Sequence, residues 1–340
     1  MNTIQSAIVL AACGAVSFIL AAVLGKFIIP WLHKLKFGQT ILEDGPTWHQ
    51  KKQGTPTMGG ILFIVGFVVA AVLGAVLAAV LKIPLSFGSL PRMVRFWAGF
   101  GLALGCGVIG FVDDFIKVVM KRNKGLTALQ KILMQLTVAT AYAVVMYVYS
   151  GHRVQVPFVG AVDFGIWYVP FTVFVILAMS NATNLTDGVD GLCGLTGFVA
   201  ALGLLLLSGL VGNGQMYQGI LAVSLAGGLS GFLLWNLHPA QVFMGDTGSL
   251  FIGGALTAIA FGIGQPFMLV PVGILYIAEN LSVILQVAYF KITHGKRLFK
   301  MSPLHHHFEM CGWSENKIVL VFSGVTLLGC AAAVLLQLYA

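Results

Sequence analysis

Ten stretches of about 20 predominantly apolar residues, each long enough to cross a bilayer as a helix, occupy most of this 340-residue chain. They cover about 7–26, 59–81, 96–116, 132–149, 166–184, 191–211, 219–236, 248–264, 267–290 and 318–338. A bilayer core offers no hydrogen-bond partners to the backbone, so such stretches span it as helices. The sequence therefore predicts one all-α domain over residues 1–340, a polytopic integral membrane bundle of about ten transmembrane helices.

The charge content excludes the main soluble classes. Only 9% of the residues are Asp, Glu, Lys or Arg, against about 25% in a soluble chain. So few charges cannot cover a soluble globule or keep a disordered chain in solution. The net charge of +8 therefore concerns membrane topology rather than nucleic-acid binding.

The basic residues predict the orientation of the bundle. An even number of spans puts both termini on one side, and 15 of the 19 Lys and Arg residues fall on the other side. Lys and Arg are enriched in cytoplasmic loops, so we expect both termini on the extracytoplasmic side. Nine of the 11 acids also fall on the predicted cytoplasmic side, which favours an active site on that face.

The first candidate motif is Asp113-Asp114-Phe-Ile-Lys117, where the third predicted span leaves the membrane. On a continuing helix Asp113 and Lys117 share one face, and Asp114 points about 100° away. The motif is either a solvated helix end with one salt bridge or a functional carboxylate pair. Such a pair would bind a divalent ion or accept a proton, and Lys117 would meet phosphate.

The second motif covers residues 180–191, Ser-Asn-Ala-Thr-Asn-Leu-Thr-Asp-Gly-Val-Asp-Gly, at the end of the fifth span. A turn needs only one Asn or Gly. This segment holds two amides, two carboxylates and two glycines. We expect a polar binding loop here rather than a plain turn.

The third motif covers residues 236–249, Asn-Leu-His-Pro-Ala-Gln-Val-Phe-Met-Gly-Asp-Thr-Gly-Ser, between the seventh and eighth spans. Asp246 stands just before a helix that we expect to begin near Thr247. It is either a simple N-cap or a metal ligand beside a helix N-terminus whose free N–H groups face a phosphate.

The fourth motif is a run of three histidines, at residues 303–309, Pro-Leu-His-His-His-Phe-Glu, in a basic loop. Consecutive histidines do not easily reach one tetrahedral zinc ion, and no cysteine pair stands nearby. The run favours a cluster that contacts phosphate or a nucleotide over a solvated patch.

Two further features carry weaker signals. Lys51 and Lys52 precede a Gly- and Thr-rich turn, and they either contact an anion or only set topology. Glu279 lies inside the ninth span, where an acid is either functional or hydrogen-bonded to a neighbouring helix. The chain has no G-x-x-x-x-G-K-[ST] motif, which disfavours an ATP-driven pump.

Carboxylates, lysines and histidines on one rim of a lipid-embedded bundle suggest phosphoryl chemistry. A soluble anionic donor and a lipid acceptor would meet at such a rim. Exchanging one pyrophosphate bond for another is nearly balanced in energy, so the reaction needs no ATP site.

The motifs, in their order along the chain, resemble those of the polyprenyl-phosphate N-acetylhexosamine-1-phosphate transferases. They are Thr55-Pro-Thr-Met-Gly-Gly60, Asp113-Asp-x-x-Lys117, Asn184-Leu-Thr-Asp-Gly188, Phe243-Met-Gly-Asp246 and His305-His-His-Phe-Glu309. The histidine run is similar to that of the muramoyl-pentapeptide branch. The resemblance implies transfer of phospho-MurNAc-pentapeptide from UDP-MurNAc-pentapeptide to undecaprenyl phosphate in bacterial peptidoglycan synthesis, which yields lipid I and UMP. It also implies Mg²⁺ as cofactor, a homodimer, and a location in the bacterial cell (inner) membrane.

The same resemblance implies roles for individual residues. Asp246 would ligate Mg²⁺, and Asp113 and Asp114 would lie close to the reacting phosphates. The uridine end of the donor would contact Lys52, Gly188, Asp190, Asn236 and Phe243, with Phe243 stacking on the base. The neighbouring donor site would be lined by Thr57, Asn184, Asp187, His305, His306 and His307. Lys117 and Lys131 would face phosphate.

Residue types alone leave two mechanisms and two other functions open. Asp113 would deprotonate the lipid phosphate for direct attack, which we favour because that phosphate is already a competent nucleophile, or a carboxylate would first form a covalent phospho-sugar intermediate. A sister transferase that uses UDP-GlcNAc differs only in its donor. A secondary transporter would place its polar residues near the bilayer midplane in interrupted helices, whereas here they gather at one rim.

Overall fold

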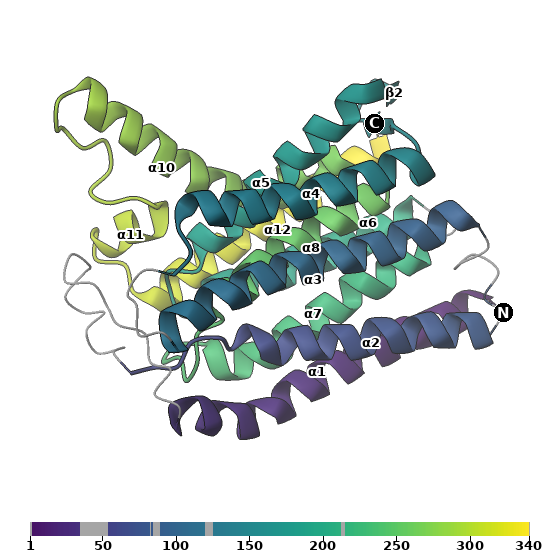
Figure 1. Ribbon diagram of the computed structural model, residues 1–340, viewed down its shortest axis with the longest axis horizontal. Helices are drawn as coiled ribbons and strands as arrows, with labels where there is room; N and C mark the ends of the chain where they lie inside the picture. Colours follow the sequence, from purple (N-terminus) through teal and green to yellow (C-terminus); the bar gives the residue numbers. More distant parts are fainter. Residues whose placement is uncertain are drawn as a thin grey trace.

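The computed structural model describes residues 2–34, 54–81, 83, 89–119, 125–211 and 215–339. Within these ranges the chain is a bundle of helices with one small hairpin (Figure 1). The long helices are α1 (Asn2–Lys34), α2 (Gly60–Val80), α3 (Leu90–Val119), α4 (Ala128–Ser150), α5 (Tyr168–Thr186), α6 (Leu192–Leu210), α7 (Met216–Asn236), α8 (Gly245–Gly262), α10 (Ile274–Ile292) and α12 (Glu315–Tyr339). The short ones are η2 (Gly165–Trp167), η3 (Pro266–Met268), α9 (Leu269–Val272) and α11 (Leu304–Glu309).

The hairpin lies between α4 and α5. Its strands, β1 (Arg153–Val156) and β2 (Gly160–Asp163), pair antiparallel with Arg153 opposite Asp163. It falls in the fourth predicted connection, at the same end of the bundle as the C-terminus (Figure 1).

Nine helices of the described part of the chain are long and apolar enough to cross a membrane. The protein is therefore a multi-pass membrane protein, and these nine helices match nine of the ten predicted windows. The remaining window, 248–264, forms α8, which does not meet the same criterion. Every residue of α8 from Thr247 to Gly262 is buried. Other helices enclose α8, so its small residues serve packing rather than contact with lipid.

Glycines let the backbones around α8 come close together. A Cβ on Gly110 of α3 would lie 2.0 Å from the backbone oxygen of Asp246. A Cβ on Gly60 of α2 would lie 2.5 Å from the Cα of Gly248. Small residues permit such close helix approach, and the contact at Gly110 places the end of α3 against the start of α8.

The ninth predicted window, 267–290, is not one continuous helix. It consists of η3, α9 and α10, with Gly273 at the break between the last two. Pro266 and Pro271 lie in the two short elements, and proline disfavours an uninterrupted helix. Figure 1 shows α10 leaning away from the bundle, with α11 beside it.

The fifth helix lies two residues further along the chain than the window 166–184, because α5 begins at Tyr168 and continues to Thr186. The prediction of a polar loop at 180–191 is therefore wrong for residues 180–186, which are helical. The hydroxyls of Ser180 and Thr186 donate to the carbonyls of Ile176 and Ala182, four residues back. A side chain that bonds back to its own helix in this way is tolerated inside it.

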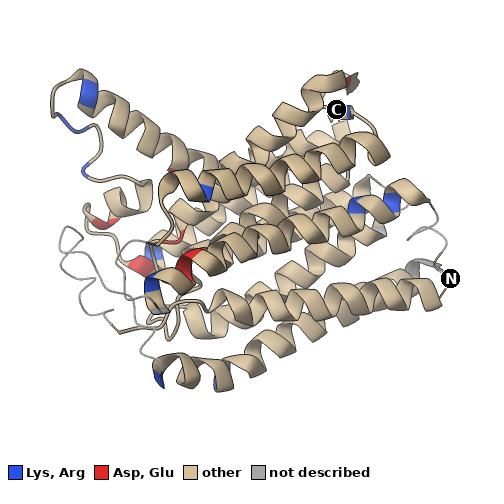
Figure 2. Cartoon of the chain, viewed as in Figure 1, with Lys and Arg blue, Asp and Glu red and all other residues tan. Residues whose placement is uncertain are grey.

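Both termini lie at the same end of the bundle (Figure 1), and the count of ten spans stays a prediction. Figure 2 shows most acidic and basic segments gathered at the opposite end, near α11. That end is the predicted cytoplasmic face, and its side of the membrane stays a prediction.

Candidate active site

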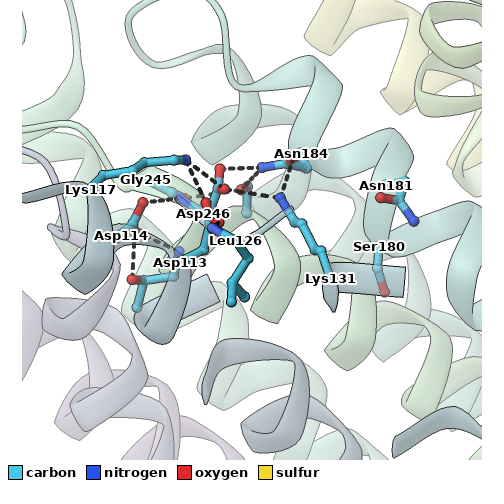
Figure 3. A network of polar contacts seen from close by, with 12 residues as sticks. Asp113, Asp114, Lys117, Leu126, Lys131, Ser180, Asn181, Asn184, Gly245 and Asp246 are labelled. Atoms are coloured by element: carbon cyan, nitrogen blue, oxygen red, sulfur yellow. Dashed lines mark hydrogen bonds and ion pairs between the residues drawn. The ribbon is translucent and has the colours of Figure 1, made fainter. Parts of the chain in front are cut away.

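Four helix ends meet at the charged end of the bundle (Figure 3). The last turns of α3 carry Asp113, Asp114 and Lys117, and the first turn of α4 carries Lys131. The last turn of α5 carries Asn184, and the first turn of α8 carries Asp246. Five of these residues were predicted from the motifs and Lys131 from the family resemblance, and the structure brings all six into one polar network.

Asp246 lies at the centre of this network. Its Oδ2 accepts hydrogen bonds from the ammonium groups of Lys117, at 3.0 Å, and Lys131, at 2.9 Å. Its Oδ1 accepts from the Asn184 amide at 2.7 Å. Lys131 also donates to the Asn184 oxygen at 3.2 Å. One carboxylate therefore joins α3, α4, α5 and α8.

Asp114 caps the start of α8 from the neighbouring helix. Its Oδ2 accepts the backbone N–H of Thr247 at 2.9 Å and the Thr247 hydroxyl at 2.7 Å. Its Oδ1 accepts the N–H of Asp246 at 3.2 Å. Met244, the residue at the N-cap position of α8, makes no capping bond with its side chain. The interpretation of Asp246 as a simple N-cap is therefore wrong, since Asp246 lies within the first turn and Asp114 does the capping.

Asp113 organises the connection into α4. Its Oδ1 accepts the N–H of Leu126 at 2.7 Å, and its Oδ2 lies 2.5 Å from the Lys117 ammonium, the contact that their spacing predicts. Thr127 and Gln130 then form a capping box that begins α4. This start places Lys131 in the first turn of α4, facing Asp246.

The surroundings of Asp246 keep its carboxyl ionised. Burial alone would raise the pKa of this carboxyl, but a hydrogen bond with Asp113 and the positive charges of Lys131 and Lys117 outweigh it. Together they hold the pKa of Asp246 well below its usual range. A carboxylate that stays ionised at any physiological pH suits a metal ligand.

The three carboxyl groups fit a divalent cation. Ligand oxygens of Asp113, Asp114 and Asp246 all lie within 4.8 Å of one another. Mg²⁺ is a hard ion that binds through one or two carboxylates plus substrate phosphates and water. Three carboxyl groups face two ammonium groups, so the ion would not enter a site of net positive charge. The donor chemistry fits the predicted Mg²⁺.

A second polar group lies beside the first, at the turn that follows α5. Asn236, at the end of α7, accepts the N–H of Gly191 at 3.1 Å and donates to the carbonyl of Val242 at 2.9 Å. It thus joins the turn 187–191 to the segment that carries Phe243. Phe243 in turn pairs by backbone hydrogen bonds with Pro56 and Gly59, each at 2.8 Å.

Thr57 also reaches the first network. A Cβ on Gly245 would lie 2.4 Å from Oδ2 of Asp114 and 2.6 Å from the Thr57 hydroxyl. Gly245 also has a φ of 67°, a left-handed conformation that favours glycine. Only a glycine fits between these two side chains at the start of α8.

The sequence gives no signal for the partners of Asp190. Its Oδ2 lies 3.0 Å from Nδ1 of His238 and accepts the N–H of Ala240 at 3.1 Å. Glu315, at the start of α12, accepts the N–H of Asp190 at 3.2 Å and lies 3.7 Å from His238. His238 and Glu315 were not predicted as site residues, and they lie 48 and 125 residues from Asp190.

The three histidines of α11 have three different partners. His305 contacts Glu279, and Nδ1 of His306 lies 2.6 Å from Glu309. Nδ1 of His307 accepts the N–H of Lys300 at 3.2 Å. Lys52, the remaining predicted site residue, lies outside the described residues.

Comparison with known proteins gives the family of this chain. Residues 96–263 match glycosyl transferase family 4, and residues 52–64 match phospho-N-acetylmuramoyl-pentapeptide-transferase signature 1. The phospho-N-acetylmuramoyl-pentapeptide-transferase of Clostridium perfringens is 44% identical over 319 residues, 94% of this chain and 95% of that protein. The chain belongs to the phospho-N-acetylmuramoyl-pentapeptide-transferase family.

Other phospho-N-acetylmuramoyl-pentapeptide-transferases are similar over comparable lengths. The protein of Desulforamulus reducens is 48% identical over 326 residues, 92% of this chain and 93% of its own. That of Listeria monocytogenes is 40% identical over 329 residues, 96% and 97% of the two chains. Membership in this phospho-N-acetylmuramoyl-pentapeptide-transferase family makes the chain a transferase, and it confirms the resemblance inferred from the motifs.

Proposed function

We propose that this protein transfers phospho-MurNAc-pentapeptide from UDP-MurNAc-pentapeptide to undecaprenyl phosphate, producing lipid I and UMP with Mg²⁺ as cofactor. The observation that carries the proposal is the cluster of Asp113, Asp114 and Asp246 with two lysines at one end of a membrane bundle. There a soluble nucleotide donor and the head of a membrane lipid can meet. The family provides the identity of the donor and the acceptor.

The carboxylates and the lysines of the site have different roles in this proposal. Asp246 would hold the ion, which when bound supplies positive charge to the reacting phosphates, and Asp113 and Asp114 would lie close to those phosphates. Lys117 and Lys131 converge on Asp246 and would turn to phosphate oxygens of the substrates. Positively charged clamps of this kind stabilise the charge that develops during phosphoryl transfer.

The turn after α5 would hold the donor. The uridine end would be bound by Lys52, Gly188, Asp190 and Asn236, and the base would stack on Phe243. Asn184, Asp187, Thr57 and the histidines of α11 would line the adjacent part. The hydrogen bonds through Asn236 support this division, because they join the turn and the Phe243 segment into one wall.

Direct attack is the mechanism that we propose. An oxygen of the lipid phosphate, deprotonated with the help of Asp113, would form a bond to the β-phosphorus of the donor, and UMP would leave with the electrons of the broken pyrophosphate bond. We also propose one catalytic domain over residues 1–340 that works as a homodimer, with its active site at the cytoplasmic face of the bacterial cell membrane.

The decisive experiment measures UMP release by the purified protein in lipid. Reactions contain undecaprenyl phosphate with either UDP-MurNAc-pentapeptide or UDP-GlcNAc, and each is run with Mg²⁺ or with EDTA. We expect release only with the muramoyl donor and Mg²⁺. Release with UDP-GlcNAc alone would indicate the sister transferase, and release in EDTA would exclude the metal-dependent reaction.

A further inference from the structure

Glu279 and His305 form a buried pair that connects α10 to α11. Oε1 of Glu279 accepts the backbone N–H of His305 at 3.2 Å, and Nδ1 of the His305 ring lies 3.2 Å from the same oxygen. The two side chains are 0% and 1% exposed. Isolated buried charges are costly, so residues of this kind are retained where they have a partner.

The geometry assigns the tautomer of His305. Oε1 is already the acceptor for a backbone N–H, and a carboxylate oxygen can accept from the ring as well. Nδ1 therefore carries the proton in a neutral ring, and Nε2 presents its lone pair. This assignment follows from the hydrogen bonds around the ring.

Nε2 of His305 lies against the turn after α5. A Cβ on Gly188 would be 2.2 Å from this nitrogen, so the ring occupies the space that any other side chain at 188 would need. Nε2 itself is buried and has no hydrogen-bond partner in the described protein. A buried acceptor without a donor costs free energy, which a hydrogen bond from a ligand at this turn would recover.

The same face of α10 holds the connection to α11 at a second point. Oε1 of Gln286 accepts the N–H groups of Leu298 and Phe299, at 3.0 and 2.9 Å. Its amide nitrogen donates to the carbonyl of Phe299 at 3.2 Å. Gln286 thus fixes the backbone of the connection, whereas Glu279 contacts the ring of His305. A mutation at Gln286 therefore tests the anchoring of the segment, and a mutation at Glu279 tests the orientation of the ring.

We infer that Glu279 is a positioning residue for the transfer reaction: it holds His305 against Gly188, protonated at Nδ1, so that Nε2 accepts a hydrogen bond from the nucleotide-sugar donor. This inference rests on the proposed function. Glu279 does not touch the substrate, and it acts through the ring of His305. The group that donates this hydrogen bond to Nε2 would be a hydroxyl or an amide N–H, and a UDP-N-acetyl sugar carries both.

The test compares Glu279→Leu, Glu279→Gln and the control Gln286→Leu. Glu279→Leu removes the acceptor for Nδ1–H, so kcat/KM for the donor should fall about 10- to 100-fold, the effect of a hydrogen bond to a charged group. The fall should appear mainly as a higher KM. Gln keeps a carbonyl oxygen in place, so Glu279→Gln should recover most of the loss. Gln286→Leu should lower thermal stability without this rise in KM.

A spectroscopic measurement is independent of turnover. In protein labelled with ¹⁵N-histidine, the ¹⁵N shifts of His305, identified by their loss in His305→Gln, report which ring nitrogen is protonated. We expect the Nδ1–H form in wild type and in Glu279→Gln, and a shift toward the Nε2–H form in Glu279→Leu. The same tautomer in all three proteins would overturn the inference, as would equal losses in Glu279→Leu and Gln286→Leu. Failure of the wild-type protein to release UMP would instead contradict the proposed function itself.

Discussion

Asp114 binds Thr247 through both the backbone N–H and the hydroxyl, at 2.9 and 2.7 Å, across 133 residues of sequence. A carboxylate on α3 therefore takes the place of an N-cap for α8. Asp246, the neighbour of Thr247, is held in its orientation by the same carboxylate. Because Asp114 caps α8 and Asp246 does not, we expect different consequences for mutations at these two residues.

Asp246→Asn should keep the fold and lose most turnover. The cap of α8 belongs to Asp114, so the fold should persist, but the thermal unfolding temperature should fall, because a neutral amide lacks the charge that pairs with Lys117 and Lys131. An amide is a weaker ligand for Mg²⁺ than a carboxylate. UMP release is measured over a Mg²⁺ titration. Wild-type activity with unchanged Mg²⁺ dependence would show that Asp246 does not ligate the metal.

Asp114→Ala should lower both stability and activity. It removes the cap and leaves the buried N–H and hydroxyl of Thr247 without an acceptor, which costs about 1–3 kcal/mol for a buried donor. Denaturation midpoints of Asp114→Ala and the wild-type protein should be compared in the same detergent. Equal midpoints would contradict the capping role of Asp114.

Asp113→Asn should lower turnover about 10²- to 10⁴-fold, the usual contribution of a positioned general base. Nucleotide binding should be largely retained. The loss should shrink as the pH rises, because a fully ionised lipid phosphate no longer needs a base. Turnover is measured from pH 6 to pH 9 together with UMP binding. A constant loss at every pH would make Asp113 a metal or structural ligand instead, and a phospho-sugar adduct trapped on a carboxylate would exclude direct attack.

Asp187, directly after α5, should be protonated in the ligand-free protein at pH 7. The carboxyl is enclosed, although the residue keeps some exposed surface, and this burial with the charges of Asp246, Asp114 and Asp190 raises its pKa to about 8. A pKa above the ordinary value of 3.8 means that the folded state holds a proton which the unfolded state has released. The contribution of Asp187 to stability is therefore full below about pH 4 and is lost as the pH rises toward 8.

Asp187→Asn imitates the protonated carboxyl at every pH and should remove this part of the pH dependence. Thermal unfolding of wild type and variant is followed from pH 5 to pH 9 in EDTA, because bound Mg²⁺ would offset the charges of Asp246 and Asp114. The variant should gain stability relative to wild type as the pH rises. Parallel curves would show that Asp187 keeps an ordinary pKa.

The orientation of the bundle is tested by cysteine labelling. Cys311 is the exposed cysteine among the five, the other four being buried. An impermeant thiol reagent should reach Cys311 only from the cytoplasmic side. In a Cys311→Ser background, Val159→Cys, at the exposed tip of the hairpin, should react only from outside. The reverse pattern would place the carboxylate cluster on the outer face.

Short-range relationships were predictable from the sequence. Asp113 and Lys117 are in contact because residues four apart share a helix face. Nine apolar windows became helices able to span a membrane, because hydrophobic length depends only on the residues within each window. The family motifs pointed in the same way to Asp113, Asp114, Lys117, Asn184 and Asp246, since each motif is continuous in the sequence.

Interactions between distant segments required the folded chain. Lys117 meets Asp246 across 129 residues, and Glu279 meets His305 from a different helix. The burial of α8 on all sides also depends on neighbouring helices. The bilayer requires apolar residues in each spanning segment, and each segment meets that requirement by itself. The contacts between distant residues arise only in the folded chain, where glycines such as Gly110 let backbones approach closely enough for charged side chains to meet.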